Sequence, residues 1–254
     1  MSLESKVAII TGGATGIGFG IAEVLASKGF KLVLAQPQLS VAQEAAKRLC
    51  ATEVLPVEVD IRNPDRVKHM VDAAVERFGQ VNVLVNNAGI TGPPALAPFL
   101  SCSPAKVDEI VDVNLKGTFY CSQSVAVQMV RQGRGGSIVH IASVGAYAAQ
   151  EFASLYCATK SALVAFAQAM ALELAPQRIR VNCVAPGDIR TGASHAIVEA
   201  RPESGASSRW VRQTPLGFQG APRDIGNAVA YLVSGEASFV TGTTLIVDGG
   251  FLAY

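Results

Sequence analysis

The chain has 254 residues, of which 50% are apolar and 16% are charged, and its formal net charge is +1. This composition supplies a sizeable core, and the balanced charge argues against a nucleic-acid partner, which usually requires a clustered basic excess. Five widely spaced cysteines include no C-x-x-C pair, so we expect reduced thiols and neither a disulfide framework nor a metal site. No apolar stretch is long enough to span a bilayer and none leads the chain, so we expect a cytoplasmic protein without a membrane partner.

Seven short apolar runs rich in β-branched residues recur along the chain and predict β-strands. Most of them are nearly continuous rather than alternating, which is the pattern of strands that are buried on both faces. The predicted strands are Val7–Ile10, Leu32–Ala35, Val54–Val59, Val81–Val85, Ile138–Ala142, Val181–Ala185 and Thr243–Val247.

Stretches with helical periodicity separate these strands. Gly29 and Gly79 each follow such a stretch, where a glycine with positive φ commonly ends a helix, and Pro64 suits the first turn of another helix. The alternation implies right-handed crossovers. The sequence therefore predicts one α/β domain over residues 1–254: a doubly wound, Rossmann-type sheet of seven parallel strands with helices on both faces. The irregular section 188–222, which contains three prolines, is expected to be a loop-and-helix insertion over the sheet.

A glycine-rich turn follows the first predicted strand, in the segment Thr11–Gly18 with the sequence TGGATGIG. Glycines allow the backbone to approach a pyrophosphate, and the following helix presents free N–H groups and the positive end of its dipole. The spacing G-x-x-x-G-x-G differs from the usual dinucleotide fingerprint, and a turn that merely joins strand to helix is the alternative. The position between the first strand and a helix favours dinucleotide binding.

The second predicted strand is followed by Gln36 and Pro37, where an Asp or Glu usually holds both ribose hydroxyls of NAD. Gln36 can still hydrogen-bond a hydroxyl, and it does not repel a 2′-phosphate. However, neither Thr15 nor Pro37 is the Arg or Lys that would attract that phosphate. The sequence leaves NAD(H) and NADP(H) open, with a slight preference for NADP(H).

Two further motifs follow the fourth and fifth predicted strands, namely Asn86-Asn87-Ala88-Gly89 and Tyr156-x-x-x-Lys160. With the glycine turn, they make the chain resemble the short-chain dehydrogenase/reductase family over essentially its whole length. The resemblance also rests on Asp60, Asn114, Ser143, Pro186-Gly187 with Ile189 and Thr191, and a final Val247-Asp248-Gly249-Gly250. Each motif alone is weak, whereas their order and spacing together are specific.

The resemblance implies a nicotinamide cofactor along the carboxyl ends of the strands. By this resemblance Asp60 caps the adenine, Asn87 and Gly89 line the cleft, and the segment 186–191 holds the nicotinamide end. From the residues alone, Asp60 as a solvated turn acid and Asn86-Asn87 as a simple turn are the alternatives. The implied cofactor-binding residues are Gly12, Thr15, Gly16, Ile17, Gly18, Gln36, Asp60, Ile61, Asn87, Ala88, Gly89, Tyr156, Lys160, Pro186, Gly187, Ile189 and Thr191.

Hydride transfer requires a proton partner for the substrate oxygen, and a free tyrosine, with a pKa near ~10, is a poor base at neutral pH. Lys160 follows Tyr156 by four residues on a predicted helix, hence on the same face, and its positive charge favours the phenolate. Ser143, at the end of the fifth predicted strand, is placed to polarise the substrate oxygen. By resemblance, Asn114 holds a water that links Lys160 to solvent.

Each of these residues has a simpler interpretation when it is taken alone. A Tyr/Lys pair one turn apart is usually a partly exposed helix face, Ser143 a strand-end cap and Asn114 a polar helix residue. Their combination with the glycine turn favours catalysis. The histidines His69, His140 and His195 do not cluster, so no metal site is expected.

The substrate is less well defined by the sequence. Residues 193–220 are expected to form a mobile lid over the nicotinamide, as the matching segment does in relatives. Within it, His195 is a candidate substrate contact, and three arginines either recognise an anion or, as we favour, solvate an exposed loop; these are Arg201, Arg209 and Arg212. Tyr147, Gln150 and the segment 96–99 are expected pocket walls.

The sequence favours an active NAD(P)-dependent alcohol dehydrogenase or ketoreductase that acts on a small-molecule carbonyl or alcohol. A catalytically silent nucleotide-binding regulator and an isomerase on the same fold are alternatives. A serine hydrolase is disfavoured because no G-x-S-x-G elbow is present. By resemblance, long helices around Ser103–Gln132 and Ala153–Leu174 predict a homotetramer.

Overall fold

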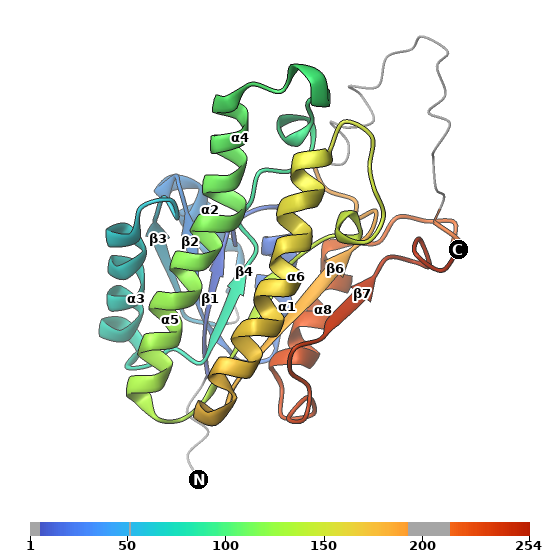
Figure 1. Ribbon diagram of the computed structural model, residues 1–254. Helices are drawn as coiled ribbons and strands as arrows, with labels where there is room; N and C mark the ends of the chain where they lie inside the picture. The colour runs from blue at the N-terminus through green and yellow to red at the C-terminus, as the bar shows by residue number, and fades with distance from the viewer. Residues whose placement is uncertain (1–5, 51, 193–213) are drawn as a thin grey trace.

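A sheet of seven parallel strands forms the centre of the computed structural model, which describes residues 6–50, 52–192 and 214–254 (Figure 1). The strand order is β3-β2-β1-β4-β5-β6-β7, and every neighbouring pair is parallel. The chain therefore runs from β1 outward to one edge and then from β4 outward to the other. The strands are β1 (Val7–Thr11), β2 (Lys31–Gln36), β3 (Val54–Glu58), β4 (Val83–Asn86), β5 (Gly136–Ile141), β6 (Ile179–Pro186) and β7 (Thr244–Val247).

The predicted fold class is confirmed, and all seven predicted strands are present, with shifts only at their ends. β4 begins at Val83 rather than Val81, because the side chain of Gln132 binds both the N–H and the carbonyl of Val81 in place of a neighbouring strand. β6 begins two residues earlier than predicted, because Ile179 still pairs with Gly136 of β5.

Helices cover both faces of this sheet. In the described residues the α-helices are α1 (Gly16–Ser27), α2 (Leu39–Arg48), α3 (Pro64–Phe78), α4 (Pro104–Val111), α5 (Thr118–Gln132), α6 (Ser154–Leu174) and α8 (Pro222–Val233). Side chains of α1, α2 and α8 pack on one face, and those of α3, α5 and α6 pack on the other (Figure 1). This is the doubly wound arrangement.

Glycine and proline set the helix boundaries that the sequence predicts. Gly29 follows α1 with a φ of 81°, and Gly79 ends α3 with a φ of 79°. Both values lie in the left-handed region, where only glycine is free of steric penalty. Pro64 opens α3, and the side chain of Asn63 caps it by accepting hydrogen bonds from two backbone N–H groups of the first turn.

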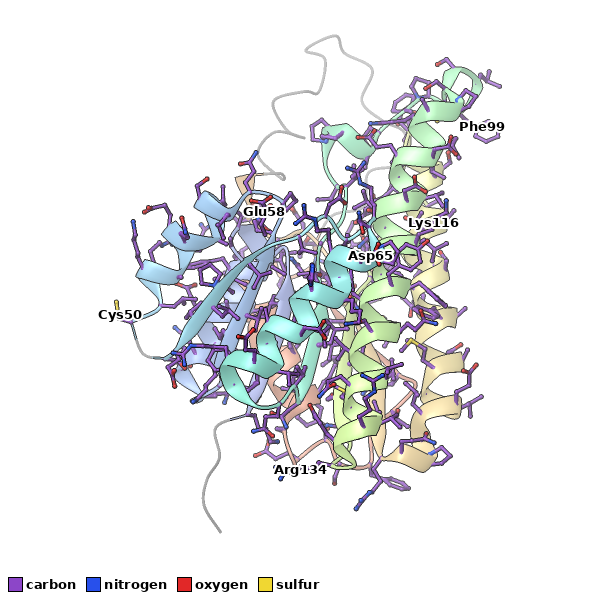
Figure 2. All side chains as sticks on the ribbon, turned by 90° about the vertical axis from the view of Figure 1, so that its left-hand side faces the viewer. Cys50, Glu58, Asp65, Phe99, Lys116 and Arg134 are labelled. Atoms are coloured by element: carbon purple, nitrogen blue, oxygen red, sulfur yellow. The ribbon has the colours of Figure 1, made fainter. Side chains whose placement is uncertain are left out.

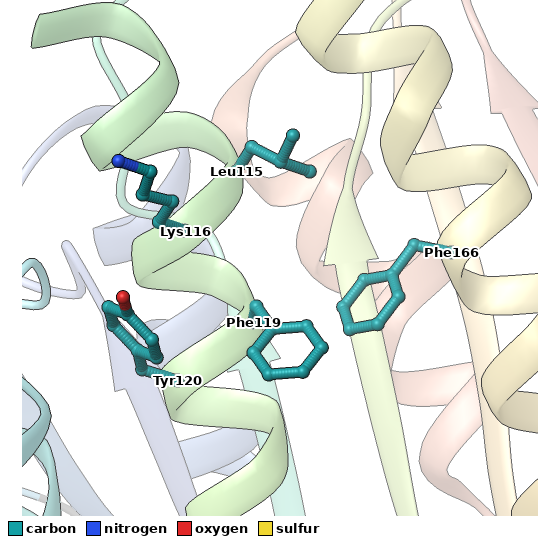
Figure 3. A pocket seen from close by; sticks show the side chains of 5 residues that line it. All are labelled: Leu115, Lys116, Phe119, Tyr120 and Phe166. Atoms are coloured by element: carbon teal, nitrogen blue, oxygen red, sulfur yellow. The ribbon is translucent and has the colours of Figure 1, made fainter. Parts of the chain in front are cut away.

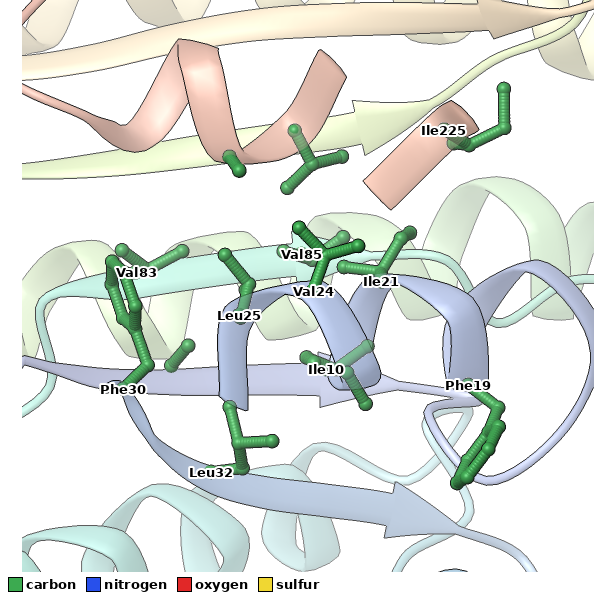
Figure 4. Close-up of a cluster of buried hydrophobic side chains, with 14 of the residues drawn as sticks. Ile10, Phe19, Ile21, Val24, Leu25, Phe30, Leu32, Val83, Val85 and Ile225 are labelled. Carbon is green, nitrogen blue, oxygen red and sulfur yellow. The ribbon is translucent and has the colours of Figure 1, made fainter. Parts of the chain in front are cut away.

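The core consists of two apolar layers, because successive strand side chains point to opposite faces. Ile10 belongs to the layer beneath α1 and α8, whereas its neighbour Ile9 belongs to the layer beneath α3 and α5. Figure 4 shows side chains of β1, β4, α1 and α8 gathered in the first layer. α1 and α8 touch closely there: a Cβ on Gly226 would lie 2.7 Å from the carbonyl oxygen of Gly20.

Two helices near the candidate site have unusual features. α4 and α5 form one long helix joined by a π-helical turn, η3 (Asp112–Gly117). α6 continues into η5 (Ala175–Gln177). The expectation that no apolar stretch could span a bilayer is wrong by length and composition, because the helix Ser154–Gln177 contains an 18-residue window with a mean hydropathy of 1.3. One such helix is weak evidence for insertion, because core helices of soluble proteins meet the same criterion. α6 also buries Ala167 and Ala171 against the sheet.

The described ends of the irregular section 188–222 pair with each other. Ile189 and Gly220 form an isolated parallel bridge, and Gly220 N donates to the carbonyl of Asp188 at 3.0 Å. The section ends as α8 begins at Pro222. Most of the predicted lid lies outside the described residues, as do His195, Arg201, Arg209 and Arg212.

Candidate active site

Glycines and polar side chains gather at the carboxyl ends of the strands. Because all strands are parallel, their carboxyl ends lie along the same side of the sheet. The glycine turn after β1, the segment 86–89 at the end of β4 and Ser143 after β5 therefore meet there. The chain reverses its direction of winding between β1 and β4, and open α/β sheets bind ligands at such a reversal.

The glycine turn is packed too tightly for side chains at Gly12, Gly13 and Gly18. Gly12 has a φ of 62°, and a Cβ there would lie 3.0 Å from Asn87 Nδ2. A Cβ on Gly18 would overlap the carbonyl oxygen of Gly12 and lie 2.5 Å from the same amide. Asn87 Nδ2 in turn donates to the carbonyls of Thr11 and Gly12, at 3.0 and 3.1 Å. Asn87 thus holds the glycine turn against β4, a contact that its expected place in the cleft does not suggest.

Thr11, the last residue of β1, ties the same two segments together. Its Oγ1 accepts hydrogen bonds from the backbone N–H groups of Asn87, at 3.0 Å, and Ala88, at 3.1 Å. The residue is only 1% exposed. Thr11 begins the glycine-rich motif on which the family resemblance rests, but it is not among the site residues predicted from the sequence.

Three features of this edge fit a bound dinucleotide. α1 begins at Gly16 without a side-chain cap and without an acidic residue in its first turn, so its first N–H groups are available to a phosphate. Gln36 Oε1, at the end of β2, is buried and has no hydrogen-bond partner among the described residues, which fits an acceptor for a ribose hydroxyl. A Cβ on Gly16 would meet nothing nearer than Thr191 Cγ2, at 3.7 Å, so the backbone there is open to a ligand.

The segment after β6 reaches the same cleft. The neighbourhood of Thr191 and Gly16 brings the predicted nicotinamide end beside the glycine turn. Ile189 is 6% exposed and is fixed by its bridge to Gly220. Gly187 N donates to the carbonyl of Val247 at 2.9 Å, which holds the start of this segment against β7.

At the far end of the cleft, Asp60 and Ile61 follow β3. The side chain of Asp60 is paired with Arg62, with 2.6 Å between Oδ2 and Nη2, and this hydrogen-bonded guanidinium lowers the pKa of the Asp60 carboxyl below its usual value. Ile61 packs against Gly117 of η3, where a Cβ would lie 2.6 Å from Ile61 Cγ1. The two residues predicted at the adenine end therefore have partners within the protein itself.

Ser143 and Tyr156 both lie close to Gly145. Ser143 is 7% exposed and caps the 3₁₀ turn η4 (Val144–Ala146), with its Oγ accepting from Gly145 N at 3.0 Å. This contact uses a lone pair and leaves the hydroxyl hydrogen free to donate. A Cβ on Gly145 would lie 3.3 Å from Ser143 Oγ and 3.4 Å from Tyr156 Cε1, so both groups border the same small space.

Lys160 lies one turn after Tyr156 on α6, as predicted. Its Nζ is 5.7 Å from the centre of the Tyr156 ring and donates to the carbonyl of Ile141 at 2.8 Å. The residue is 6% exposed, so its charge acts through a medium of low dielectric constant. The buried ammonium group is therefore held in a fixed position beside the Tyr156 ring.

Asn114 occupies the π-helical turn η3 and is 1% exposed. Its Oδ1 accepts from Ile90 N at 2.7 Å, and its Nδ2 donates to the carbonyl of Ile90 at 3.1 Å. A Cβ on Gly89 would lie 3.1 Å from Asn114 Oδ1 and 3.7 Å from Lys160 Nζ, so both side chains border one gap that glycine leaves open. π-Helical turns of this kind often mark functional sites.

A buried polar cluster lies beside this gap. His140 of β5 is 0% exposed, its Nδ1 lies 3.0 Å from Asn86 Nδ2, and its ring stacks on Phe166 of α6. Burial, together with the positive charge of Lys160, lowers the pKa of His140 to about 3. His140 is thus a packed strand residue, as expected, and His69 is exposed on α3. In the part of the chain that the structure describes, no His, Cys, Asp and Glu side chains gather as metal ligands.

We predict that His140 weakens the protein in acid. An unfolded histidine has a pKa near ~6.5, so between that pH and about 3 the unfolded chain binds a proton that the native state excludes. Stability falls as the pH decreases through this window, by up to about 1.4 kcal/mol per pH unit from one such group. Urea unfolding at a series of pH values should show a smaller loss for His140→Asn than for the wild type between about pH 6.5 and 4.5. Equal losses of stability in the wild type and His140→Asn would contradict the role given to His140.

The sequence and the fold both match known proteins. Residues 12–252 fit the family model described as enoyl-(acyl carrier protein) reductase. The chain is 36% identical over 255 residues to the L-rhamnose-1-dehydrogenase of Scheffersomyces stipitis, with 98% of this chain and 96% of the relative covered. A short-chain type dehydrogenase/reductase from Mycobacterium marinum superposes with a TM-score of 0.91 at 33% identity, over 99% of this chain and 97% of the other. The chain belongs to the short-chain dehydrogenase/reductase family.

This short-chain dehydrogenase/reductase is an oxidoreductase that uses a nicotinamide cofactor. A 3-ketoacyl-(acyl-carrier-protein) reductase from Brucella melitensis, solved in complex with NADH, has a TM-score of 0.86 to it at 33% identity, over 98% of this chain and 99% of the other. The glycine turn, the uncapped start of α1 and the unpartnered Gln36 Oε1 agree with such a cofactor.

Proposed function

We propose that this short-chain dehydrogenase/reductase is an active alcohol dehydrogenase or ketoreductase that interconverts a secondary alcohol and a ketone. Its proposed catalytic residues are Asn114, Ser143, Tyr156 and Lys160. The observation that carries the proposal is that Ser143 Oγ and the Tyr156 ring border the same small space beside Gly145, with Lys160 Nζ 5.7 Å from that ring. This arrangement offers two hydroxyl groups to one substrate oxygen and a buried cation to the group that must change protonation.

A nicotinamide cofactor held by the glycine turn and the segment 186–191 would supply or accept the hydride. During reduction, Tyr156 Oη gives its proton to the substrate oxygen while Ser143 donates a hydrogen bond to the same oxygen. Lys160, fixed on the carbonyl of Ile141, stabilises the phenolate that remains. Asn114 orients a water in the gap beside Gly89, through which the phenolate regains its proton. Oxidation of the alcohol uses the same groups in reverse.

Turnover assays test this proposal directly. Purified protein mixed with NADH or NADPH and a panel of carbonyl compounds should show a sustained loss of absorbance at the nicotinamide band, proportional to protein concentration. Cofactor binding without turnover across the panel would favour the regulator, the alternative from a different functional class. Conversion of substrate without net consumption of cofactor would favour an isomerase.

We propose that the cofactor is preferentially NADP(H). Gln36 presents no carboxylate to repel a 2′-phosphate. A hollow of about 340 Å³ opens beside the glycine turn, with Thr15 and Ser40 among its lining residues and Arg48 as its one cationic side chain. The guanidinium of Arg48 lies 4.0 Å from the centre of the Phe19 ring, which fixes its position. α2 also begins without a side-chain cap, so its first N–H groups add to the attraction for an anion.

Substitutions in this hollow should separate the two cofactors. Arg48→Ala is expected to weaken NADPH binding roughly tenfold and to leave NADH binding nearly unchanged, because only NADPH carries the phosphate. Glu44 lines the same hollow and is paired with Lys47 at 2.5 Å, so Glu44→Gln should tighten NADPH binding alone. Fluorescence titration of both cofactors measures the effect, with Arg66→Ala on α3 as a control. Tighter NADH than NADPH binding by the wild type would overturn the preference.

We propose that the protein is a homotetramer assembled partly through α5 and α6. Phe119 of α5 and Phe166 of α6 stack with ring centres 5.5 Å apart and line a hollow of about 400 Å³ with Leu115, Lys116 and Tyr120 (Figure 3). Phe119, Val127 and Val130 are 44%, 45% and 46% exposed on one side of α5, and such apolar patches commonly mark interfaces. Light scattering should give the mass of four chains, and Phe119→Glu should reduce it. A monomeric wild type would contradict the proposal.

We further propose that the protein works in the cytoplasm on small molecules, without a nucleic-acid or membrane partner. The formal net charge of +1 and the five free cysteines support this proposal.

A further inference from the structure

Phe152, two residues before α6, has a strained backbone. Its φ is 60°, in the left-handed region that bulky side chains avoid. Among the described residues only one other non-glycine residue, Arg178, has a positive φ, and it ends the short turn η5. The Phe152 residue remains 55% exposed, so burial of the ring does not offset the strain. A glycine would adopt this conformation without strain. The presence of a phenylalanine here therefore suggests that its ring has a role.

The turn at Phe152 is fixed beside the candidate active site. It belongs to the segment that links η4, next to Ser143, to α6, which carries Tyr156. The carbonyl of Phe152 accepts a hydrogen bond from Ala97 N at 2.8 Å, in the segment that follows Gly89. The loops after β4 and β5 therefore meet at Phe152, on the edge of the sheet where the reacting groups lie.

The two loops that meet at Phe152, residues 90–102 and 143–153, form a rim beside the reacting groups that carries almost no charge. Residues 90–102 contain no Asp, Glu, Lys, Arg or His, and residues 143–153 contain one charged residue, Glu151. Tyr147 is 49% exposed, and Phe99 is 77% exposed at the outer end of the rim, before α4 (Figure 2). These loops offer no cation to an anionic substrate, whereas an apolar group that covers their rings removes apolar surface from water.

We propose that Phe152 contacts the substrate and that the substrate carries an apolar arm, an alkyl chain or an aryl ring, beside its reacting carbon. The proposal rests on the oxidoreductase function proposed for this site. Ser143 and Tyr156 hold the oxygen, and the rings of Phe152 and Tyr147 cover the arm. The strained turn keeps the Phe152 ring in place before substrate arrives, so little side-chain freedom is lost on binding.

Methyl ketones of increasing chain length, from propanone to 2-octanone, test this inference with dihydroxyacetone as the polar comparison. For the wild type, kcat/KM should rise roughly two- to fourfold for each methylene that becomes covered. Phe152→Ala should flatten this rise and leave kcat/KM for propanone nearly unchanged. Phe239→Ala removes a fully exposed ring that precedes β7, at the amino ends of the strands and away from the reacting groups. This variant should keep the wild-type rise.

The variant Phe152→Gly separates loss of the contact with substrate from loss of stability. This variant removes the ring and the backbone strain together, so its Tm should equal or exceed that of the wild type. Its dependence on chain length should be as flat as that of Phe152→Ala. A flat dependence in a variant at least as stable as the wild type cannot arise from partial unfolding.

Binding without turnover distinguishes failure of this inference from failure of the proposed function. Calorimetric titration of 2-octanol into the protein loaded with NADPH should show tight binding to the wild type and weak binding to Phe152→Ala. If no ketone is reduced but this difference is found, the apolar contact stands and the proposed reaction is wrong. If ketones are reduced with the same chain-length dependence in Phe152→Ala, or if dihydroxyacetone is the preferred substrate, the inference is overturned. If Phe152→Ala changes the mass of the protein in solution but not its chain-length dependence, the ring contacts another copy of the chain. This result would also overturn the inference.

Discussion

Tyr156→Phe is expected to lower kcat by about 10²- to 10⁴-fold, the usual contribution of a positioned general acid or base. The change deletes one hydroxyl and keeps the ring that lies 3.4 Å from the Cβ position of Gly145. Lys160 keeps its contact with the carbonyl of Ile141, and Thr159 Oγ1 still donates to the backbone carbonyl of residue 156. The local structure should therefore persist while the proton donor is lost.

A measurement of cofactor affinity separates loss of proton transfer from loss of cofactor binding. NADPH titration should give dissociation constants for Tyr156→Phe within about twofold of the wild type, because the change removes one hydroxyl and leaves the other implied cofactor-binding residues in place. Tyr231→Phe, which deletes the hydroxyl of a tyrosine 42% exposed on α8, should leave both kcat and affinity unchanged. Undiminished turnover by Tyr156→Phe would show that the phenol does not transfer the proton.

Gly18→Ala is expected to weaken cofactor binding by about 100-fold, an effect of about 2.7 kcal/mol. The added methyl group would overlap the carbonyl oxygen of Gly12 and lie 2.5 Å from Asn87 Nδ2, so the glycine turn must move. Movement also breaks the hydrogen bonds from Asn87 that hold the turn against β4. The N–H groups at the start of α1 then no longer point at the place where a phosphate binds.

Thermal unfolding with and without cofactor measures this loss independently of turnover. Saturation at about 100 times the dissociation constant stabilises a protein by about 2.7 kcal/mol, which raises the Tm of a chain of this size by roughly 5–10 °C. Gly18→Ala should lose most of this increase, whereas Gly235→Ala should keep it, because a Cβ on Gly235 meets nothing within 4 Å. Equal increases in both variants would contradict the role given to the glycine turn.

The sequence by itself determined the fold class and the linear order of the candidate site. Strands buried on both faces must be apolar at nearly every position, and this requirement is local, so runs such as Val7–Ile10 could be recognised without knowledge of their neighbours. Gly79 and Pro64 were equally recognisable, because the conformations that end and begin a helix are properties of the residues themselves. The pair Tyr156 and Lys160 was recognisable because helical periodicity places them on one face.

Only the tertiary structure decided which groups meet. Thr11 and Asn87 are 76 residues apart, and nothing in either local pattern indicates that the threonine hydroxyl fixes the backbone of the second motif. The π-helical turn at Asn114 and the binding of its amide to Ile90 likewise depend on how α5 packs against β4. The positive φ of Phe152, and the hydrogen bond that its carbonyl accepts from Ala97 of another loop, are likewise not indicated by the local sequence. The physical reason is the same in each case: periodicity and propensity act between near neighbours, whereas hydrogen bonds and close contacts across the sheet form only after the chain has folded.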